Sequence, residues 1–100
     1  MAVTDSSYGG LVRTTAVTAG TTSAAVLTTA QCYVTCQPGG GGTMTAPASW
    51  SSRDAIAANT AVWQDWNSGT VSATTTEELL GANAVRFVAT TAAGVGEVTR

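Results

Sequence analysis

The chain has 100 residues, a length that forms one domain with a single modest core. Threonine and alanine supply more than a third of it, lysine and histidine are absent, and charged residues are 10% of the chain, against about 25% in typical globular domains. Six acidic residues and four arginines give a net charge of −2. The scattered arginines form no basic stripe, which argues against a nucleic-acid partner and against a basic membrane-surface helix.

Targeting and membrane segments are not predicted. No stretch approaches the roughly 18 consecutive apolar residues of a membrane-spanning helix. The acidic, polar start is unlike a secretory signal, so we expect folding in the cytosol and no membrane partner. Residues 1–10 lack hydrophobic periodicity and predict an N-terminal arm with Tyr8 as an anchor, whereas residues 11–100 predict a single folded domain.

Short strands are expected along the first half of the domain, because stretches rich in β-branched residues alternate with turn signals. The expected strands cover residues 11–17, 21–29, 31–37 and 43–46. Pro38 and the four glycines that follow it end the third strand abruptly. We interpret this glycine run, residues 39–42, as a flexible hairpin loop whose backbone is also able to approach a neighbouring subunit closely.

The second half predicts two β-hairpins. Residues 53–58 are able to form a helical turn, but we expect strand or irregular structure there. Residues 60–66 and 70–75, joined by Asn67-Ser-Gly69, predict the first hairpin. Residues 84–90 and 95–99 predict the second. In total, about seven or eight short strands with turn signals every 8 to 12 residues indicate an all-β fold, a small antiparallel β-sandwich or barrel.

Strand edges are the first hint of function. Lysine on edge strands commonly blocks edge-to-edge pairing, and this chain has no lysine. We therefore expect a partner to cover the edges, which favours an assembly.

Catalytic groups are scarce. Nucleophilic catalysis by serine or cysteine normally needs a general base, and both histidine and lysine are absent. A carboxylate pair for glycoside hydrolysis and a calcium site that includes Asp54 or Asp65 stay open, without a motif to support either. The glycine run lacks the Lys-Ser or Lys-Thr of a phosphate-binding loop. We predict no enzyme, no cofactor and no metal site.

The two cysteines, Cys32 and Cys36, fall on one face of an expected strand with Val34. Four residues of strand span roughly 13 Å, whereas the Cα atoms of a disulfide lie within about 7 Å. A bridge would therefore need the strand to fold back. We interpret the cysteines as buried apolar thiols. A redox or intermolecular role is the alternative, as is a metal pair that has no other cysteine or histidine to complete it.

Four residues are candidates for an interface: Tyr8, Trp63, Trp66 and Arg86. Trp63 and Trp66 are three positions apart, so on a strand they point to opposite faces. We expect one in the core and the other at the surface, as a contact for a protein or a stacking surface for a sugar. Arg86 interrupts an apolar run. Either it points outward with its stem over apolar surface, or it forms an ion pair with another subunit.

The segment Val62-Trp63…Trp66-Asn-Ser-Gly-Thr-Val71, followed by Leu80-Gly81 and Ala84-Val-Arg-Phe-Val88, resembles small β-sandwich proteins of tailed-bacteriophage virions. The likeness covers residues 60–99, and residues 11–46 in style alone; the cysteines and the glycine run have no counterpart in it. The resemblance implies a capsid decoration, or cement, protein of the virion, assembled in the host cytoplasm. Its partners would be the major capsid protein and further copies of itself. A tail or head-fibre module that binds a host-surface glycan is the alternative.

Overall fold

A computed structural model of the chain describes residues 3–5, 11–14 and 16–99, with side chains from residue 16 onward. In this part of the chain all named strand pairs are antiparallel, which confirms the predicted all-β fold class. The elements are β1 (Val3–Asp5), β2 (Leu11–Thr14), β3 (Val26–Leu27), β4 (Gln31–Pro38), β5 (Met44–Thr45), β6 (Ala48–Ser49), α1 (Arg53–Ala57), β7 (Thr75–Leu80), β8 (Ala84–Val85), β9 (Val88–Ala89) and β10 (Gly94–Thr99).

A five-stranded sheet in the order β1-β2-β10-β4-β7 forms the first layer. Strand β4 was predicted from its alternating pattern, and the structure confirms it. Cys32, Val34 and Cys36 are buried, whereas Gln31 and Tyr33 on the other face are exposed. Such a period of two is what a strand with one face on a core requires. Strand β1 lies within the predicted N-terminal arm, and Tyr8 lies outside the described residues.

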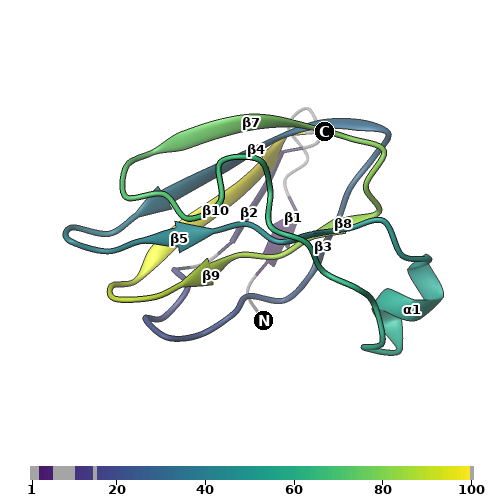
Figure 1. The fold of residues 1–100 in the computed structure, drawn as a ribbon, viewed down its shortest axis with the longest axis horizontal. Helices are drawn as coiled ribbons and strands as arrows, with labels where there is room; N and C mark the ends of the chain where they lie inside the picture. Colours follow the sequence, from purple (N-terminus) through teal and green to yellow (C-terminus); the bar gives the residue numbers. More distant parts are fainter. Residues whose placement is uncertain (1–2, 6–10, 15, 100) are drawn as a thin grey trace.

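The second layer consists of the sheet β3-β8-β6 and the pair β5-β9. The chain passes from β5 to β6 and from β8 to β9 after two irregular residues each time, so the two small sheets form one interrupted layer. Isolated bridges widen it, from Thr22 to Val88 on one side and from Gln64 to Ala48 on the other. Figure 1 shows β5, β8 and β9 in front of β2 and β10 of the first layer.

The core lies between the two layers and depends on two glycines of β10. A Cβ atom added to Gly96 would lie 2.3 Å from Cγ of Phe87, and one added to Gly94 would lie 2.2 Å from Sδ of Met44. Phe87 and Met44 are both fully buried. The largest core side chains of the second layer therefore rest directly on the backbone of the first layer.

Both predicted hairpins are wrong. Residues 60–66 and 70–75 do not pair with each other, because Gln64 bridges to Ala48 and Val71 bridges to Met44. Strand β9 pairs with β5, and β10 pairs with β2 and β4, so these consecutive strands belong to different layers. The glycine run likewise joins β4 and β5 across the layers. The turn signals mark real chain reversals, but the strands that they join find their partners elsewhere in the sequence.

The helical turn α1 corrects the expectation of strand or irregular structure at residues 53–58. Ser52 is its N-cap, and its Oγ accepts a hydrogen bond from the Ala55 amide at 3.1 Å. Asp54 in the first turn adds a favourable interaction with the helix dipole. Nη2 of Arg53 donates a hydrogen bond to the carbonyl of Thr28, and this bond attaches α1 to the second layer. Figure 1 shows α1 projecting at one end of the molecule.

Candidate functional site

Surface features are the candidates in this molecule. No pocket is found over the residues that the structure describes, and within them no three histidine, cysteine, aspartate or glutamate side chains are placed to hold a metal ion. None of the described residues forms a helix that is long and apolar enough to span a membrane. The predicted interface residues are divided between the core and the surface.

Trp66 is the core member of the tryptophan pair, with 6% of its surface exposed. Its Nε1 donates a hydrogen bond to the carbonyl of Gly69, and the amide of Gly69 donates to the carbonyl of Trp66 at 2.9 Å. Gly69 has a φ of 60°, which glycine adopts without strain. The turn at residues 66–69 thus satisfies the polar atom of a buried indole, and Trp66 is not available for contact with a partner in this fold.

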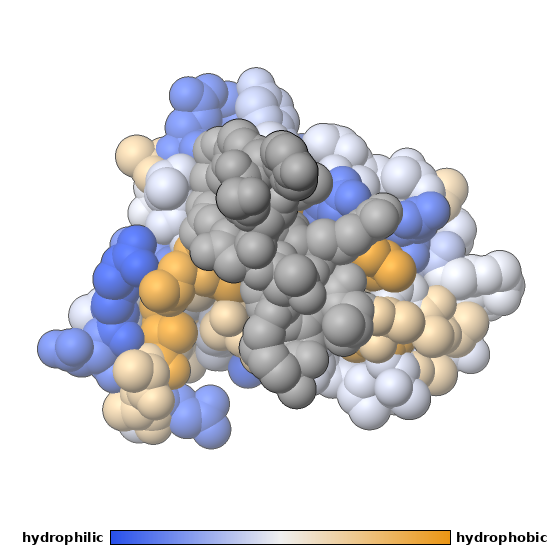
Figure 2. Space-filling model, turned by 180° about the vertical axis from the view of Figure 1, so that it is seen from behind, coloured by the Kyte–Doolittle hydropathy of each residue, from blue (hydrophilic) through white to orange (hydrophobic). Residues whose placement is uncertain are grey.

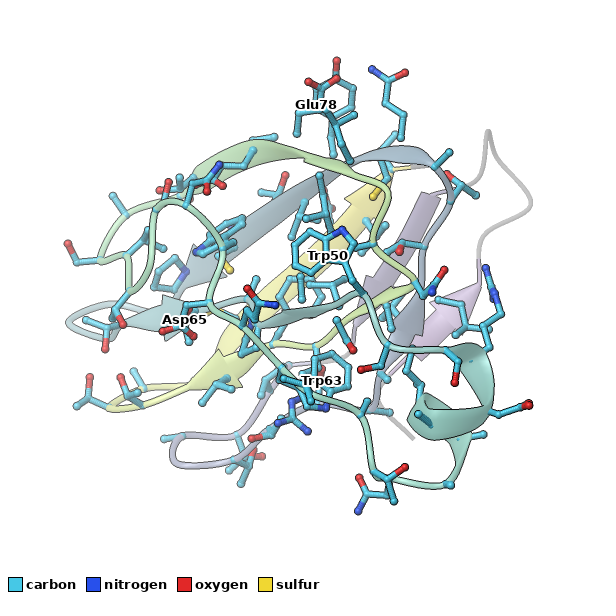
Figure 3. All side chains as sticks on the ribbon, turned by 45° about the vertical axis from the view of Figure 1, so that its right-hand side comes forward. Trp50, Trp63, Asp65 and Glu78 are labelled. Atoms are coloured by element: carbon cyan, nitrogen blue, oxygen red, sulfur yellow. The ribbon has the colours of Figure 1, made fainter. Side chains whose placement is uncertain are left out.

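Trp63 covers Arg86. The guanidinium carbon of Arg86 lies 4.2 Å from the centroid of the Trp63 ring, which is a close cation–π contact. Both side chains are half-buried. Because Val85 and Phe87 on either side of Arg86 point into the core, Arg86 and the ring above it lie on the outer face of the second layer, where Trp63 is labelled in Figure 3. The structure thus brings two of the four predicted residues together.

The charge of Arg86 has no acidic partner within the described residues. Its Nε is buried without a hydrogen bond, and so is Oγ1 of Thr45. The two terminal nitrogens of Arg86 make no described hydrogen bond and are not buried. Arg86 is therefore a cation with a partly buried stem, stabilised by an aromatic ring and open to solvent at its tip.

Trp50 is the residue that sequence reasoning missed. It follows β6 in a serine-rich loop and is 46% exposed, although its Nε1 donates to the carbonyl of Leu80 at 3.1 Å. Leu80, the last residue of β7, is 60% exposed. An aromatic residue between two serines, Ser49 and Ser51, was the available signal. Trp50, Leu80 and the half-exposed Tyr33 of β4 are hereafter the β7 surface.

The β7 surface bends around an edge of the sandwich. Tyr33 lies opposite Glu78 and Gln31 lies opposite Leu80 on the outer face of the first layer, where Gln31 donates to the Glu78 carboxylate. Figure 3 shows Glu78 and Trp50 on opposite sides of the β7 ribbon. From behind, areas of strong hydrophobic colour lie beside hydrophilic residues in the part that Figure 2 colours.

The free edge of β7 carries two features that oppose edge-to-edge pairing although the chain has no lysine. Gly81 donates to the carbonyl of Ala30 in continuation of the β4–β7 register, so by antiparallel alternation the backbone groups of Thr76, Glu78 and Leu80 face the free edge. The indole Nε1 of Trp50 donates a hydrogen bond to the carbonyl of Leu80 at the end of this edge. Glu77, on the opposite side of the strand from Glu78, is an inward-pointing charge, a device that opposes edge-to-edge pairing.

Both cysteines are buried thiols that form no disulfide, at 1% exposure for Cys32 and 0% for Cys36. Burial, together with the nearby carboxylate of Glu77, raises the pKa of Cys36 from 9.0 to about 12. A thiol with such a pKa stays protonated at neutral pH and is a poor nucleophile. The buried apolar role predicted for the cysteines agrees with this environment.

The glycine run packs against its own chain. A Cβ atom at Gly39 would lie 2.1 Å from the carbonyl oxygen of Ala93, and one at Gly42 would lie 2.7 Å from Cβ of Ala92. The backbone of the run therefore approaches the turn before β10.

Comparison of the chain with protein-family models, with curated proteins and with solved structures finds no match.

Proposed function

We propose that the chain is a structural binding module, a capsid decoration protein of a tailed bacteriophage that docks on the major capsid protein. The observation that carries the proposal is the β7 surface. Trp50, Leu80 and Tyr33 are about half exposed or more, whereas Phe87, Met44 and Trp66 are enclosed in the core. Large aromatic side chains held at a surface are characteristic anchors of protein–protein contacts.

The geometry of Trp50 suits such an anchor. Its hydrogen bond to Leu80 fixes one edge of the indole while about half of the ring surface stays in solvent. A side chain that is already ordered loses less conformational entropy on binding than a free one. Docking would bury Trp50 and Leu80 together. The polar residues around them, Gln31 and Glu78, would form the rim of the contact.

A decoration protein with this surface acts by mass action. Because it binds the assembled shell and not the separated subunits, each bound copy shifts the equilibrium toward the shell. We expect particles that carry the protein to resist thermal dissociation better than bare particles. No chemical step is required of the chain.

Co-sedimentation with particles tests the proposal. The chain is incubated with heads assembled from the major capsid protein of the same genome, and the bound fraction is measured after centrifugation. Wild type should sediment with the heads, and Trp50→Ala and Leu80→Ser should reduce the bound fraction by about tenfold or more. Leu27→Ser is the matched control, because Leu27 of β3 is 45% exposed but lies outside the β7 surface. Failure of the wild type to bind, or equal loss in all three variants, would contradict the proposal.

A glycan-binding tail or head-fibre module is the second candidate, and the exposure of Trp50 is the observation that favours it. Trp66 is buried and the Trp63 ring already stacks on Arg86, so a sugar would stack on Trp50. A glycan array probed with the wild type, Trp50→Ala and Trp63→Ala decides the case. Binding that is lost in Trp50→Ala and kept in Trp63→Ala supports this candidate. An array without any hit for the wild type argues against it.

A further inference from the structure

Arg86 lies on the outer face of the second layer. Its amide donates to the carbonyl of Pro47 on one side. The carbonyl of the next residue, Phe87, accepts from the amide of Ser23 on the other side. Hydrogen bonds that alternate between two neighbours are typical of a strand inside a sheet. Because Val85 and Phe87 are buried in the core, the side chain of Arg86 between them points away from the core.

The charge of Arg86 is left without a counter-charge. No acidic side chain that the structure describes forms an ion pair or a hydrogen bond with this guanidinium. The terminal nitrogens of Arg86 make no described hydrogen bond and are not buried. These donors are therefore open to an anion that another molecule supplies.

Trp63 holds the guanidinium in place from one side. Gln64 exchanges two hydrogen bonds with Ala48, at 2.7 and 2.9 Å, and the amide of Val62 donates to Oγ of Ser51 at 3.0 Å. The backbone is thus attached to β6 and to the loop after it on both sides of Trp63, and the ring lies 4.2 Å from the guanidinium carbon. A carboxylate at the open edge would accept two parallel hydrogen bonds from a planar donor that is already oriented.

We propose that Arg86 and Trp63 form a binding site for a single carboxylate, an acidic side chain of the protein on which the chain docks. The inference rests on the proposed function, because it specifies the chemistry of that partner beside the β7 surface. A polyanion such as nucleic acid is disfavoured, since the site has one guanidinium and the chain has a net charge of −2. A small free acid is disfavoured because no pocket is found over the described residues to enclose it.

The site adjoins the β7 surface, so one partner is able to cover both. In the sequence Trp50 lies between Ala48 and Ser51, the two residues to which the Trp63 segment is attached. Val62, next to Trp63, is 67% exposed, and Trp50 is 46% exposed; both tryptophans are labelled in Figure 3. An interface that extends from Trp50 past Val62 would place a charged pair beside an aromatic anchor.

Binding to heads at two salt concentrations tests the inference. Dissociation constants are obtained from the bound fraction over a series of head concentrations, in about 50 mM and about 500 mM NaCl. Arg86→Gln should raise the dissociation constant about tenfold at low salt and depend less on salt than the wild type. Arg86→Glu should bind more weakly still, because two carboxylates would then face each other. Arg13→Gln removes the same charge from β2, in the first layer, and should bind like the wild type.

Two kinds of failure are distinguishable. Wild type that does not bind heads contradicts the proposed function and, with it, this inference. Wild type that binds, with Arg86→Gln equal to it or with Arg86→Glu no weaker than Arg86→Gln, overturns the acidic partner alone. Acidic glycans on an array that bind the wild type and not Arg86→Gln, with head binding unchanged, would assign the carboxylate to a sugar and also overturn it.

Thermal unfolding of each variant is measured in parallel, because the stem of Arg86 is partly buried. Arg86→Lys keeps the charge but not the planar fork, so its dissociation constant should lie between those of the wild type and Arg86→Gln. If neither Arg86→Gln nor Arg86→Glu folds, Arg86→Lys and the salt dependence of the wild type decide the question. Wild-type binding that salt leaves unchanged overturns the inference.

Discussion

Glycine is needed at position 96 because a side chain there would overlap the ring of Phe87, and not because the backbone adopts a conformation that only glycine allows. The ring of Phe87 occupies the position that a Cβ atom would take, with three ring carbons within 2.5 Å of it. We expect Gly96→Ala to reduce the free energy of unfolding by about 1 to 3 kcal/mol, since the ring is fully enclosed and has little room to move. Denaturant unfolding followed by circular dichroism measures the change.

Gly40→Ala is the matched control for Gly96→Ala. Gly40 has no atom within 4 Å of an added Cβ and has no positive φ. Its unfolding free energy should stay within about 0.5 kcal/mol of the wild type. Equal effects of the two substitutions would show that steric contact with Phe87 is not the reason for glycine in β10.

We expect the buried thiol of Cys36 to lower the free energy of unfolding as the pH rises into the alkaline range. Its pKa is about 12 in the folded chain against 9.0 for an ordinary thiol, so above pH 9 the unfolded chain loses this proton first. The contribution of the thiol is complete below pH 9 and is lost as the pH rises from 9 toward 12, by at most about 1.4 kcal/mol per pH unit. Urea unfolding at several pH values should therefore show a steeper decline for the wild type than for Cys36→Ala. Parallel declines would contradict the assignment.

At the scale of elements, β7 carries a charge that opposes edge-to-edge pairing although the chain has no lysine. Glu77 points toward the core side of the sheet at its margin, where an added strand would bury its carboxylate. We expect Glu77→Val to promote concentration-dependent association, measured by static light scattering. Thr76→Val, a β-branched substitution on the outer face of the same strand, should scatter like the wild type. A Glu77→Val protein that stays as dispersed as the wild type would show that the charge does not protect the edge.

The elements also show why local patterns predicted some strands and not their partners. In β4 the alternation Cys32, Val34, Cys36 specifies both the strand and its buried face, since burial on one side is a local property. Around Asn67-Ser-Gly69 the turn was indicated, but Gln64 and Val71 pair with residues 48 and 44. Strand partners depend on which edges lie free in three dimensions, which local sequence does not encode.

At the scale of the whole molecule, the contact of Phe87 with Gly96 and of Met44 with Gly94 couples the two layers. We expect them to unfold as one cooperative unit. Reactivity of the buried Cys36 thiol reports on the first layer and fluorescence of the buried Trp66 reports on the second, with Trp50 and Trp63 replaced by phenylalanine to isolate its signal. The two probes should give the same denaturant midpoint. Separate midpoints would show that the layers unfold independently.

The candidate surfaces follow the same division between local and tertiary information. The sequence indicated that Trp63 and Trp66 face opposite ways, because their separation is odd and a strand was expected there. It did not indicate which one is buried or that Arg86, 23 positions from Trp63, lies under its ring. Trp50 was overlooked since its exposure depends on the end of β7, 30 residues further along the chain.

By itself the sequence determined the all-β class, the strand β4 with its buried face and the burial of its cysteines, since each depends on composition or on a period of two within a few residues. Tertiary structure decided the strand order, the position of Glu77 at the β7 edge and the contact of Arg86 with Trp63. These features depend on which segments, distant in the chain, lie side by side in the fold. Packing between the two layers determines that arrangement, in particular where Phe87 and Met44 contact the glycines of β10.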